Sequence, residues 1–275
     1  MTLDYPRGAN KCLAAAVLLL ALPGCAGIPP AAAVMTPEIR PGVAAGYLAL
    51  ADIPHSAMLL PPPPAAGSQA FAADMEANKL RAQHGSPRWK QAKLDAVLSF
   101  PEAAGIFECA LDVPVTESGT PHLYRLLRRT RTDAAVVSDA AKDKYARGRP
   151  FVSNGEPSCT PEKEVELARN GSYPSGHTSI GWAWALILSE VAPARSNQIL
   201  ARGRSYGQSR VVCNVHWNSD VVEGRSMGAA VVARLHGDPD FRADVAAARR
   251  EIEGLRARGI KPARDCVAEA EALAG

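Results

Sequence analysis

Charged and nucleophilic side chains gather in three short stretches of the sequence, around 142–150, 174–178 and 209–220. In the first stretch, Lys142 and Arg149 are seven residues apart, about two helical turns, so both side chains can lie on one helix face that ends at Pro150. Two converging cations suit an oxyanion, and the planar fork of arginine suits phosphate best. Because a basic helix face is usually just solvated, this stretch alone is weak evidence.

The second stretch places a serine and a glycine at the start of an expected helix. Pro174-Ser175-Gly176-His177 is followed by the helical run 178–190. Free backbone N–H groups at such a helix start, with the positive end of the helix dipole behind them, form an anion site. Gly176 lets the backbone approach the anion closely, and His177 would lie beside it in the first turn. The simpler alternative is an ordinary serine cap with an incidental histidine.

The third stretch pairs a histidine with a carboxylate. His216 and Asp220 are four residues apart, which makes them neighbours on one face of a helix expected over 216–236. A carboxylate bonded to one imidazole nitrogen fixes the tautomer and leaves the other nitrogen lone pair free, as a nucleophilic histidine requires. Arg210 adds a third cation. The alternative is a capping aspartate beside a core histidine.

Together the three stretches supply three cations, an anion site at a helix start and two histidines, one of them with a carboxylate partner. Each stretch has a plain structural explanation when it is considered alone. Their chance assembly in one chain is improbable, so the sequence predicts a site that binds phosphate and carries a histidine nucleophile.

Helices must position these residues, because apolar residues recur at helical spacing from residue 71 onward. The expected helices cover 71–83, 89–98, 121–145, 177–191, 194–209, 216–236, 239–258 and 261–273. A loop with one short helix at 161–169 is expected over 151–173, which contains two prolines and two glycines. No strand alternation persists and no internal repeat is found. The predicted fold class is therefore all-α, a compact helical bundle.

Length and composition limit the remaining possibilities. With 275 residues, 47% hydrophobic and 21% charged, the chain is neither disordered nor fibrous. A formal net charge of +3 is too weak and too evenly spread to indicate nucleic-acid binding. We expect one domain over 69–275, preceded by a Pro/Ala-rich arm over 26–68. The arm either wraps over the domain or a neighbouring subunit, or forms a loose linker.

The first 25 residues have the features of a secretory signal peptide. Two basic residues precede the ten apolar residues 13–22, which are too few to span a bilayer as a helix. Leu22-Pro23-Gly24-Cys25 also resembles a bacterial lipobox, in which Cys25 would be lipidated. Cleavage by the ordinary signal peptidase near Ala26 or Ala33 is the alternative. No later segment reaches the ~18 apolar residues of a membrane helix, so no transmembrane helix is expected in the mature protein.

Four cysteines follow the signal region: Cys109, Cys159, Cys213 and Cys266. An even number in an oxidising compartment indicates two disulfides, for which three pairings are possible. A zinc site is the alternative, and no CxxC or His-Cys cluster supports it.

The three stretches also match a known signature. Lys-x6-Arg-Pro, Pro-Ser-Gly-His and Ser-Arg-x5-His-x3-Asp, in this order, resemble the signature of the acid phosphatase and vanadium haloperoxidase (PAP2-type) superfamily, with no departure. The wider stretches 170–178 and 209–221 resemble bacterial class A non-specific acid phosphatases in particular, as do 60–66 and 120–129. The similarity extends from about residue 40 to about residue 250. It implies the all-α fold of that superfamily.

The resemblance implies a metal-independent acid phosphatase that hydrolyses phosphomonoesters of broad structure through a phosphohistidine intermediate. His216 would attack the phosphorus, and Asp220 would orient His216 and stabilise its charge. His177 would protonate the leaving alkoxide and then deprotonate the water that cleaves the phosphoenzyme. Because His177 must be protonated as an acid, activity is expected to be higher below neutral pH.

Five further residues would hold the three non-bridging oxygens and the charge that grows on them: Lys142, Arg149, Arg210, Ser175 and Gly176. These fixed cations and donors would do the work of a metal ion, so neither a metal nor another cofactor is expected. The same resemblance implies that Cys159 and Cys213 are disulfide partners.

The resemblance also implies the molecules that the protein meets. Small phosphomonoesters such as nucleotides, sugar phosphates and aryl phosphates are the expected substrates, with vanadate as an inhibitor and transfer of the phosphoryl group to alcohols as a side activity. A periplasmic location is expected, with lipid anchoring through Cys25 left open, as is homo-oligomerisation. No nucleic-acid binding is expected.

Three other functions are alternatives to this interpretation. In a vanadium-dependent haloperoxidase, the same residues would bind vanadate with His216 as its axial ligand. A membrane lipid phosphatase shares the signature but requires several membrane helices. A non-catalytic binding protein would be favoured by a broken signature, and this one is intact.

Overall fold

Long helices form the body of the protein and bury most of its apolar side chains. The computed structural model describes residues 36–274 of the chain. The long helices are α5 (Pro121–Val136), α9 (Gly176–Val191), α10 (Ser196–Val212), α11 (Asn218–Leu235) and α12 (Pro239–Ala257). The shorter ones are α1 (Ser56–Leu59), α2 (Gln69–Lys79), α3 (Pro87–Leu94), α4 (Glu108–Leu111), α6 (Asp139–Tyr145), α7 (Pro150–Asn154), α8 (Glu164–Leu167) and α13 (Cys266–Ala274). The all-α prediction is confirmed.

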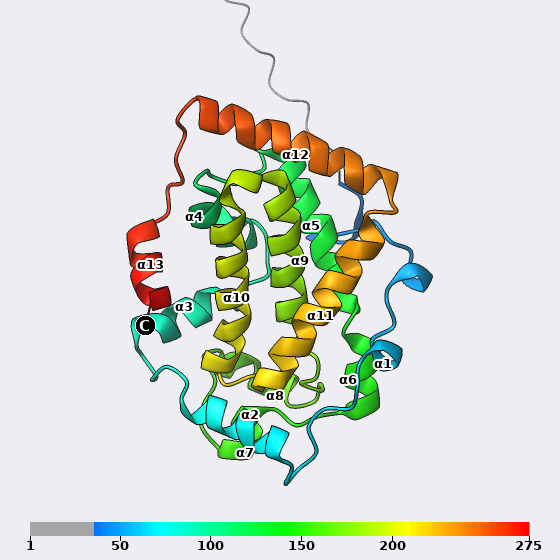
Figure 1. Ribbon diagram of the computed structural model, residues 1–275, viewed down its shortest axis with the longest axis vertical. Helices are drawn as coiled ribbons and strands as arrows, with labels where there is room; N and C mark the ends of the chain where they lie inside the picture. The colour runs from blue at the N-terminus through cyan, green and yellow to red at the C-terminus, as the bar shows by residue number, and fades with distance from the viewer. Residues whose placement is uncertain (1–35, 275) are drawn as a thin grey trace, which may run out of the picture. The chain divides into compact units, whose positions relative to one another are not determined.

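Helix α9 lies at the centre because its sequence is apolar on every side. Trp184, Ile187 and Leu188 are fully buried. The helix contacts α5, α10 and α11, and Figure 1 shows it between α10 and α11, with α12 across one end. At the end away from α12, α9 and α11 begin and α10 ends. This topology gathers the start of α9, the last turn of α10 and the loop before α11 in one place.

Small residues let α11 approach α9 closely at that end. A Cβ atom on Gly224 would lie 2.6 Å from the carbonyl oxygen of Ser175, and one on Gly228 would lie 2.6 Å from that of Ser179. Both distances are below van der Waals contact, so a larger residue at either position would push the helices apart. The glycines therefore fix the distance between α11 and the first turn of α9.

The helix expected over 121–145 is divided in two, and the chain turns again before Arg149. Helix α6 ends at Tyr145 because Ala146 adopts a left-handed conformation (φ 40°). The expectation that Lys142 and Arg149 share a helix face is therefore wrong. Arg149 is the N-cap residue of α7, and Pro150 begins that helix instead of ending one.

The helix expected over 216–236 begins later than predicted. Helix α11 starts at Asn218, so His216 lies in the preceding loop and shares no helix face with Asp220. Asp220 sits in the first turn, where its carboxylate accepts the backbone N–H of Trp217 (2.9 Å) and caps the helix. This capping role of Asp220 is the one considered above as an alternative, and it coexists with the histidine contact.

Residues 36–68 pack against the helical body. A short antiparallel pair, β1 (Glu38–Arg40) and β2 (Val43–Ala44), departs from the expectation of no strands. The Tyr47 backbone N–H donates to Asp133 of α5 (2.9 Å) and its hydroxyl donates to Asp244 of α12 (2.5 Å). The predicted signal peptide, the lipobox at Cys25 and the cleavage sites lie outside the described residues. Within residues 36–274, no helix is both long and apolar enough to cross a membrane.

Two disulfides use the four cysteines that follow the signal region. Cys109 pairs with Cys266 and Cys159 pairs with Cys213. The pairing implied by the resemblance for Cys159 and Cys213 is present, and no cysteine of the four is left for the zinc site considered as an alternative.

Candidate active site

A cavity of about 470 Å³ lies where α9 and α11 begin and α10 ends. We call it the catalytic cavity. Six of the eight predicted site residues line it: Lys142, Arg149, Gly176, His177, Arg210 and His216. Ser175 and Asp220 are fully buried directly behind them. The three stretches that the sequence singled out therefore meet in space.

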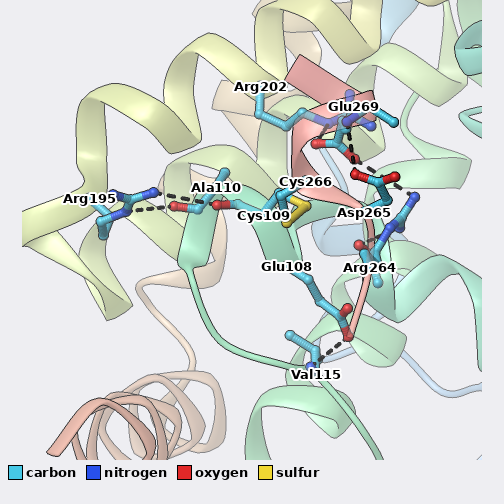
Figure 2. Close-up of a disulfide and its surroundings, with 12 residues drawn as sticks. Glu108, Cys109, Ala110, Val115, Arg195, Arg202, Arg264, Asp265, Cys266 and Glu269 are labelled. Carbon is cyan, nitrogen blue, oxygen red and sulfur yellow. Dashed lines mark hydrogen bonds and ion pairs between the residues drawn. A yellow bond between two sulfur atoms is a disulfide. The ribbon is translucent and has the colours of Figure 1, made fainter. Parts of the chain in front are cut away.

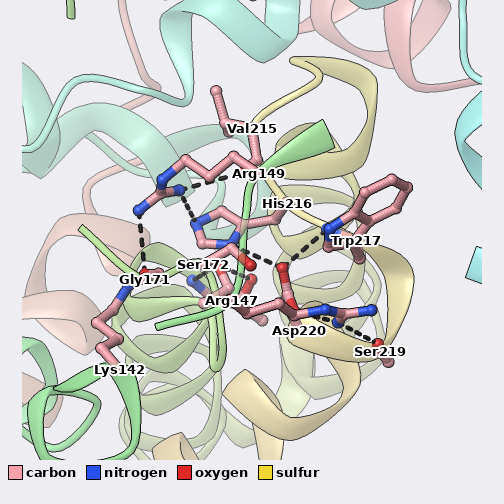
Figure 3. A network of polar contacts seen from close by, with 12 residues as sticks. Lys142, Arg147, Arg149, Gly171, Ser172, Val215, His216, Trp217, Ser219 and Asp220 are labelled. Atoms are coloured by element: carbon pink, nitrogen blue, oxygen red, sulfur yellow. Dashed lines mark hydrogen bonds and ion pairs between the residues drawn. The ribbon is translucent and has the colours of Figure 1, made fainter. Parts of the chain in front are cut away.

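His216 is held by a partner at each ring nitrogen (Figure 3). Its Nδ1 lies 3.3 Å from Oδ2 of Asp220, and its Nε2 lies 3.2 Å from Nη1 of Arg149. Since a guanidinium can only donate, Nε2 carries the lone pair and Nδ1 carries the proton that faces the carboxylate. The backbone N–H of Ser175 donates to the Asp220 carbonyl oxygen (3.0 Å), which joins this arrangement to the start of α9.

Arg147 is a site residue that sequence reasoning missed. Its guanidinium donates to Oδ1 of Asp220 (2.6 Å), to Oγ of Ser219 (2.7 Å) and to Oδ2 of Asp74 in α2 (2.8 Å). The Asp220 carboxylate thus binds His216 through one oxygen and Arg147 through the other. The residue lies inside the stretch 142–150, but nothing local indicated its partner, because Asp74 is distant in sequence.

Carbonyl oxygens position two of the three cations. Lys142 Nζ donates to the Gly171 carbonyl (2.7 Å), and Arg149 donates to the carbonyls of Leu167 (2.8 Å) and Val215 (3.0 Å). These contacts fix the side chains without neutralising them, since a carbonyl carries no net charge. Both charges therefore remain available to an anion in the cavity.

Arg210 has donors with no partner. It is 3% exposed, and its Nε and Nη1 atoms make no hydrogen bond within residues 36–274. Leaving a buried charged donor unsatisfied is costly, so such a group calls for a ligand. An anion in the catalytic cavity would supply the acceptors.

The turn that begins α9 contains the serine cap considered above as the simpler alternative, and the anion site stays a prediction. Ser175 is the N-cap residue, and its Oγ accepts from the backbone N–H of Thr178 (3.3 Å). Gly176 lines the cavity, whereas Ser175 is fully buried. His177 follows in the first turn, with Nε2 3.1 Å from the carbonyl oxygen of Ala96.

Burial, and after it the neighbouring cations, oppose protonation of the basic groups that line the cavity. Burial, and after it the nearby Arg149, lower the pKa of Lys142 to about 7. Burial also holds the pKa values of His177 and His216 well below the usual range, with Arg210 and Arg149 as the main additional causes. Burial raises the pKa of Asp220, and Arg147 opposes that rise. A bound anion would reverse the effect on the basic groups.

A second buried network is centred on Asp95, whose charge acts on the pKa of Arg210. Asp95 accepts from Arg202 (2.5 Å) and from Oγ of Ser209 (2.5 Å). Arg202 also pairs with Glu269 of α13 (3.2 Å), and Figure 2 shows the Cys109–Cys266 disulfide fastening that helix beside it. Sequence reasoning missed Asp95 and Arg202, because their partners are brought together only by the fold.

Metal ligands are not grouped in the described part of the chain. Within residues 36–274, no cluster of three or more His, Cys, Asp or Glu side chains could hold a metal ion. The expectation of a reaction without a metal stays a prediction.

Comparison with known proteins identifies relatives over most of the chain. Residues 131–242 match the PAP2 superfamily. A non-specific acid phosphatase of Providencia stuartii is 41% identical over 212 residues, 76% of this chain and 86% of the relative. An acid phosphatase of Zymomonas mobilis is 42% identical over 74% of this chain and 78% of the relative. A non-specific acid phosphatase of Salmonella typhimurium is 43% identical over 72% of this chain and 80% of the relative.

Proposed function

The chain belongs to the PAP2 superfamily, among its non-specific acid phosphatases, and we propose that it hydrolyses phosphomonoesters of broad structure through a phosphohistidine, without a metal ion. The observation that carries this proposal is His216, which lines a cavity of cations and accepts from Arg149 through its Nε2 lone pair while Nδ1 is held by Asp220. A phosphate that takes over this donor of Arg149 would lie next to Nε2. A neutral imidazole in that setting is a nucleophile aimed at an anion.

In the first step, the Nε2 lone pair of His216 attacks phosphorus as the bond to the alcohol oxygen breaks. Asp220 stabilises the positive charge that develops on the imidazole. Lys142, Arg149 and Arg210 stabilise the negative charge on the non-bridging oxygens, together with backbone N–H groups at Gly176. The leaving oxygen takes a proton from His177.

In the second step, a water molecule attacks the phosphorus of the phosphohistidine. His177, now neutral, takes one proton from the water, and the bond between Nε2 and phosphorus breaks. Inorganic phosphate leaves, and His216 returns to its starting state. An alcohol in place of water would give the proposed phosphotransfer side activity.

The charge of the substrate supports the role of His177 as the acid. In the free cavity its pKa is held low by burial and by Arg210. A phosphate dianion between these groups adds negative charge beside the ring and so favours the imidazolium. The substrate thus helps to protonate the acid that it needs, and this protonation is easier at acidic pH.

The test is hydrolysis of p-nitrophenyl phosphate from about pH 4 to about pH 9, with excess EDTA and with or without vanadate. Wild type should be most active below neutral pH, keep its activity in EDTA and be inhibited by vanadate. His216→Ala should lose on the order of 10³-fold or more. His236→Ala, at an exposed histidine outside the site, is the matched control. Activity that EDTA removes, or that His216→Ala keeps, contradicts the mechanism.

The haloperoxidase alternative has its own assay. Oxidation of bromide by peroxide in the presence of vanadate would be the signal, with His216→Ala as the control. The names of the relatives favour the phosphatase.

We also propose export to the periplasm, supported by the sequence of residues 1–25. Cell fractionation tests the location, and metabolic labelling with a fatty acid, compared with Cys25→Ser, tests lipid anchoring. Association of copies stays a prediction, which size-exclusion chromatography with light scattering would check.

A further inference from the structure

A second hollow of about 390 Å³ lies beside the catalytic cavity, between the end of α3 and the turn Pro161–Lys163. We call it the side hollow. It shares Ala96, Thr160 and Lys163 with the lining of the catalytic cavity. A ligand in one can therefore extend into the other.

The hydroxyl of Thr160 is left without a partner at this junction. Thr160 is 4% exposed, and its Oγ1 makes no hydrogen bond within residues 36–274. A buried hydroxyl usually finds a partner, because losing its hydrogen bonds to water is costly. A polar atom of a ligand that passes from one space to the other would satisfy it.

The expected acid of the reaction lies at the same junction. His177 Nε2 is 3.1 Å from the carbonyl oxygen of Ala96, the residue that lines both spaces. Lys163, also shared, is close enough to His177 to contribute to its lowered pKa. Because the leaving oxygen must reach His177, the alcohol part of a bound substrate is directed towards the side hollow.

The lining of the side hollow defines what it can bind. Leu94 and Val97 give it an apolar wall, and Leu94 is 56% exposed. Lys90, Lys93 and Lys163 stand around it, opposed by Glu162. None of these three lysines forms an ion pair within the described residues, so their charge is available to a ligand.

The wall opposite α3 is held in place before a ligand arrives. The Cys159–Cys213 disulfide ties the residue before Thr160 to the end of α10, and the Cys159 N–H donates to the Cys213 carbonyl (3.1 Å). Ser158 N–H donates to the Glu164 carboxylate (2.6 Å). A preformed wall reduces the entropy lost on binding.

We propose that the side hollow is a leaving-group subsite, which selects phosphomonoesters whose alcohol part is an apolar, aromatic body bearing a second anionic group. This inference rests on the proposed phosphatase function, because it assigns the hollow to the substrate of that reaction. The apolar wall would contact the ring, the lysines would attract the anionic group, and Thr160 would bond a polar atom between them.

The charge is tested with phenyl phosphate and 3-carboxyphenyl phosphate, two substrates that differ by one carboxylate. In Lys93→Glu, the ratio of kcat/KM for the carboxylated substrate to that for phenyl phosphate should fall about 3- to 10-fold relative to wild type. Lys79→Glu is the control, because this exposed lysine of α2 does not line the side hollow. It should leave the ratio unchanged.

The hydroxyl is tested with Thr160→Val, which keeps the side-chain shape. Removing an unpartnered buried hydroxyl should leave Tm unchanged or raise it. The ratio of kcat/KM for 3-carboxyphenyl phosphate to that for methyl phosphate should nevertheless fall about 2- to 10-fold. Ratios that stay at the wild-type value in both Lys93→Glu and Thr160→Val overturn the subsite.

The two proposals can fail separately. If His216→Ala keeps its activity, the proposed reaction fails, whatever the ratios show. If hydrolysis depends on His216 but both ratios stay constant, the subsite alone is wrong.

Discussion

Replacing Arg147 tests how strongly the carboxylate of Asp220 depends on its buried partner. The Arg147 side chain is 8% exposed and bridges Asp74 and Asp220, whose side chains are 4% and 0% exposed. Arg147→Met would leave two buried carboxylates without their cation. Breaking a buried pair in this way costs about 3–5 kcal/mol, so the free energy of unfolding should fall by about that amount.

The same change should alter the pH dependence of the reaction. Arg147 opposes the rise in the pKa of Asp220 that burial causes, so its removal raises that pKa further. Since Asp220 acts as a carboxylate, activity is lost as pH falls through its pKa. The acid limb of kcat/KM should therefore move to higher pH, and kcat/KM should drop on the order of 10²-fold. This loss is smaller than the ~10⁴-fold that follows from removing the function of an orienting carboxylate itself.

Urea denaturation and pH profiles with p-nitrophenyl phosphate measure these effects. Arg147→Lys should recover part of the lost stability and part of the lost kcat/KM, because lysine restores the positive charge but not the planar guanidinium that binds both carboxylates. Arg234→Met is the control: it breaks a pair with Asp52 in which both side chains are about half exposed, and should cost less than about 1 kcal/mol. A loss of stability as small as that of the control, with an unmoved acid limb, would refute the reasoning.

Other predictions concern the cation site, the helix contact and the disulfide. Affinity for sulfate, measured by calorimetry, should weaken as pH rises through about 7, because Lys142 loses its proton there. In Lys142→Met, this fall in affinity near pH 7 should be absent. Gly228→Ala should destabilise by about 1–3 kcal/mol in urea, because its Cβ would strike a backbone oxygen of α9. Gly254→Ala, in open space on α12, should be neutral or stabilising. Replacing Cys159 and Cys213 by serine should cost about 2–5 kcal/mol and lower Tm, as reduction of the wild type should.

The sequence was sufficient to predict which residues meet but not how they meet. Lys142 and Arg149 were expected on one helix face, yet Ala146 ends α6 between them and both still reach the catalytic cavity. His216 and Asp220 were expected on one face, yet α11 begins after the histidine. In both cases the two residues are separated by only a few positions in the sequence. A loop of that length brings their side chains together as well as a helix does.

The residues that sequence reasoning missed have a common property: their partners are far away in the chain. Arg147 is separated from Asp74 by 73 residues, and Arg202 from Asp95 by 107. Local patterns carry information over one or two helical turns, so such pairs become visible only when the fold exists. That His216 and the three cations line one cavity could be predicted, because they lie in contiguous stretches of the sequence.

The electrostatics of the catalytic cavity are the reason why we expect activity to be higher at acidic pH. Lys142, Arg149 and Arg210 are buried near two histidines, while the buried carboxylate beside His216, Asp220, is already paired with Arg147. The cations that line the cavity outnumber its two carboxylates, Asp139 and Glu166, and together with burial they lower the pKa values of its basic groups. A phosphate dianion supplies negative charge, so binding and protonation reinforce each other. Lower pH favours both, because it keeps Lys142 charged and favours the imidazolium form of His177 that we propose as the acid for the leaving group.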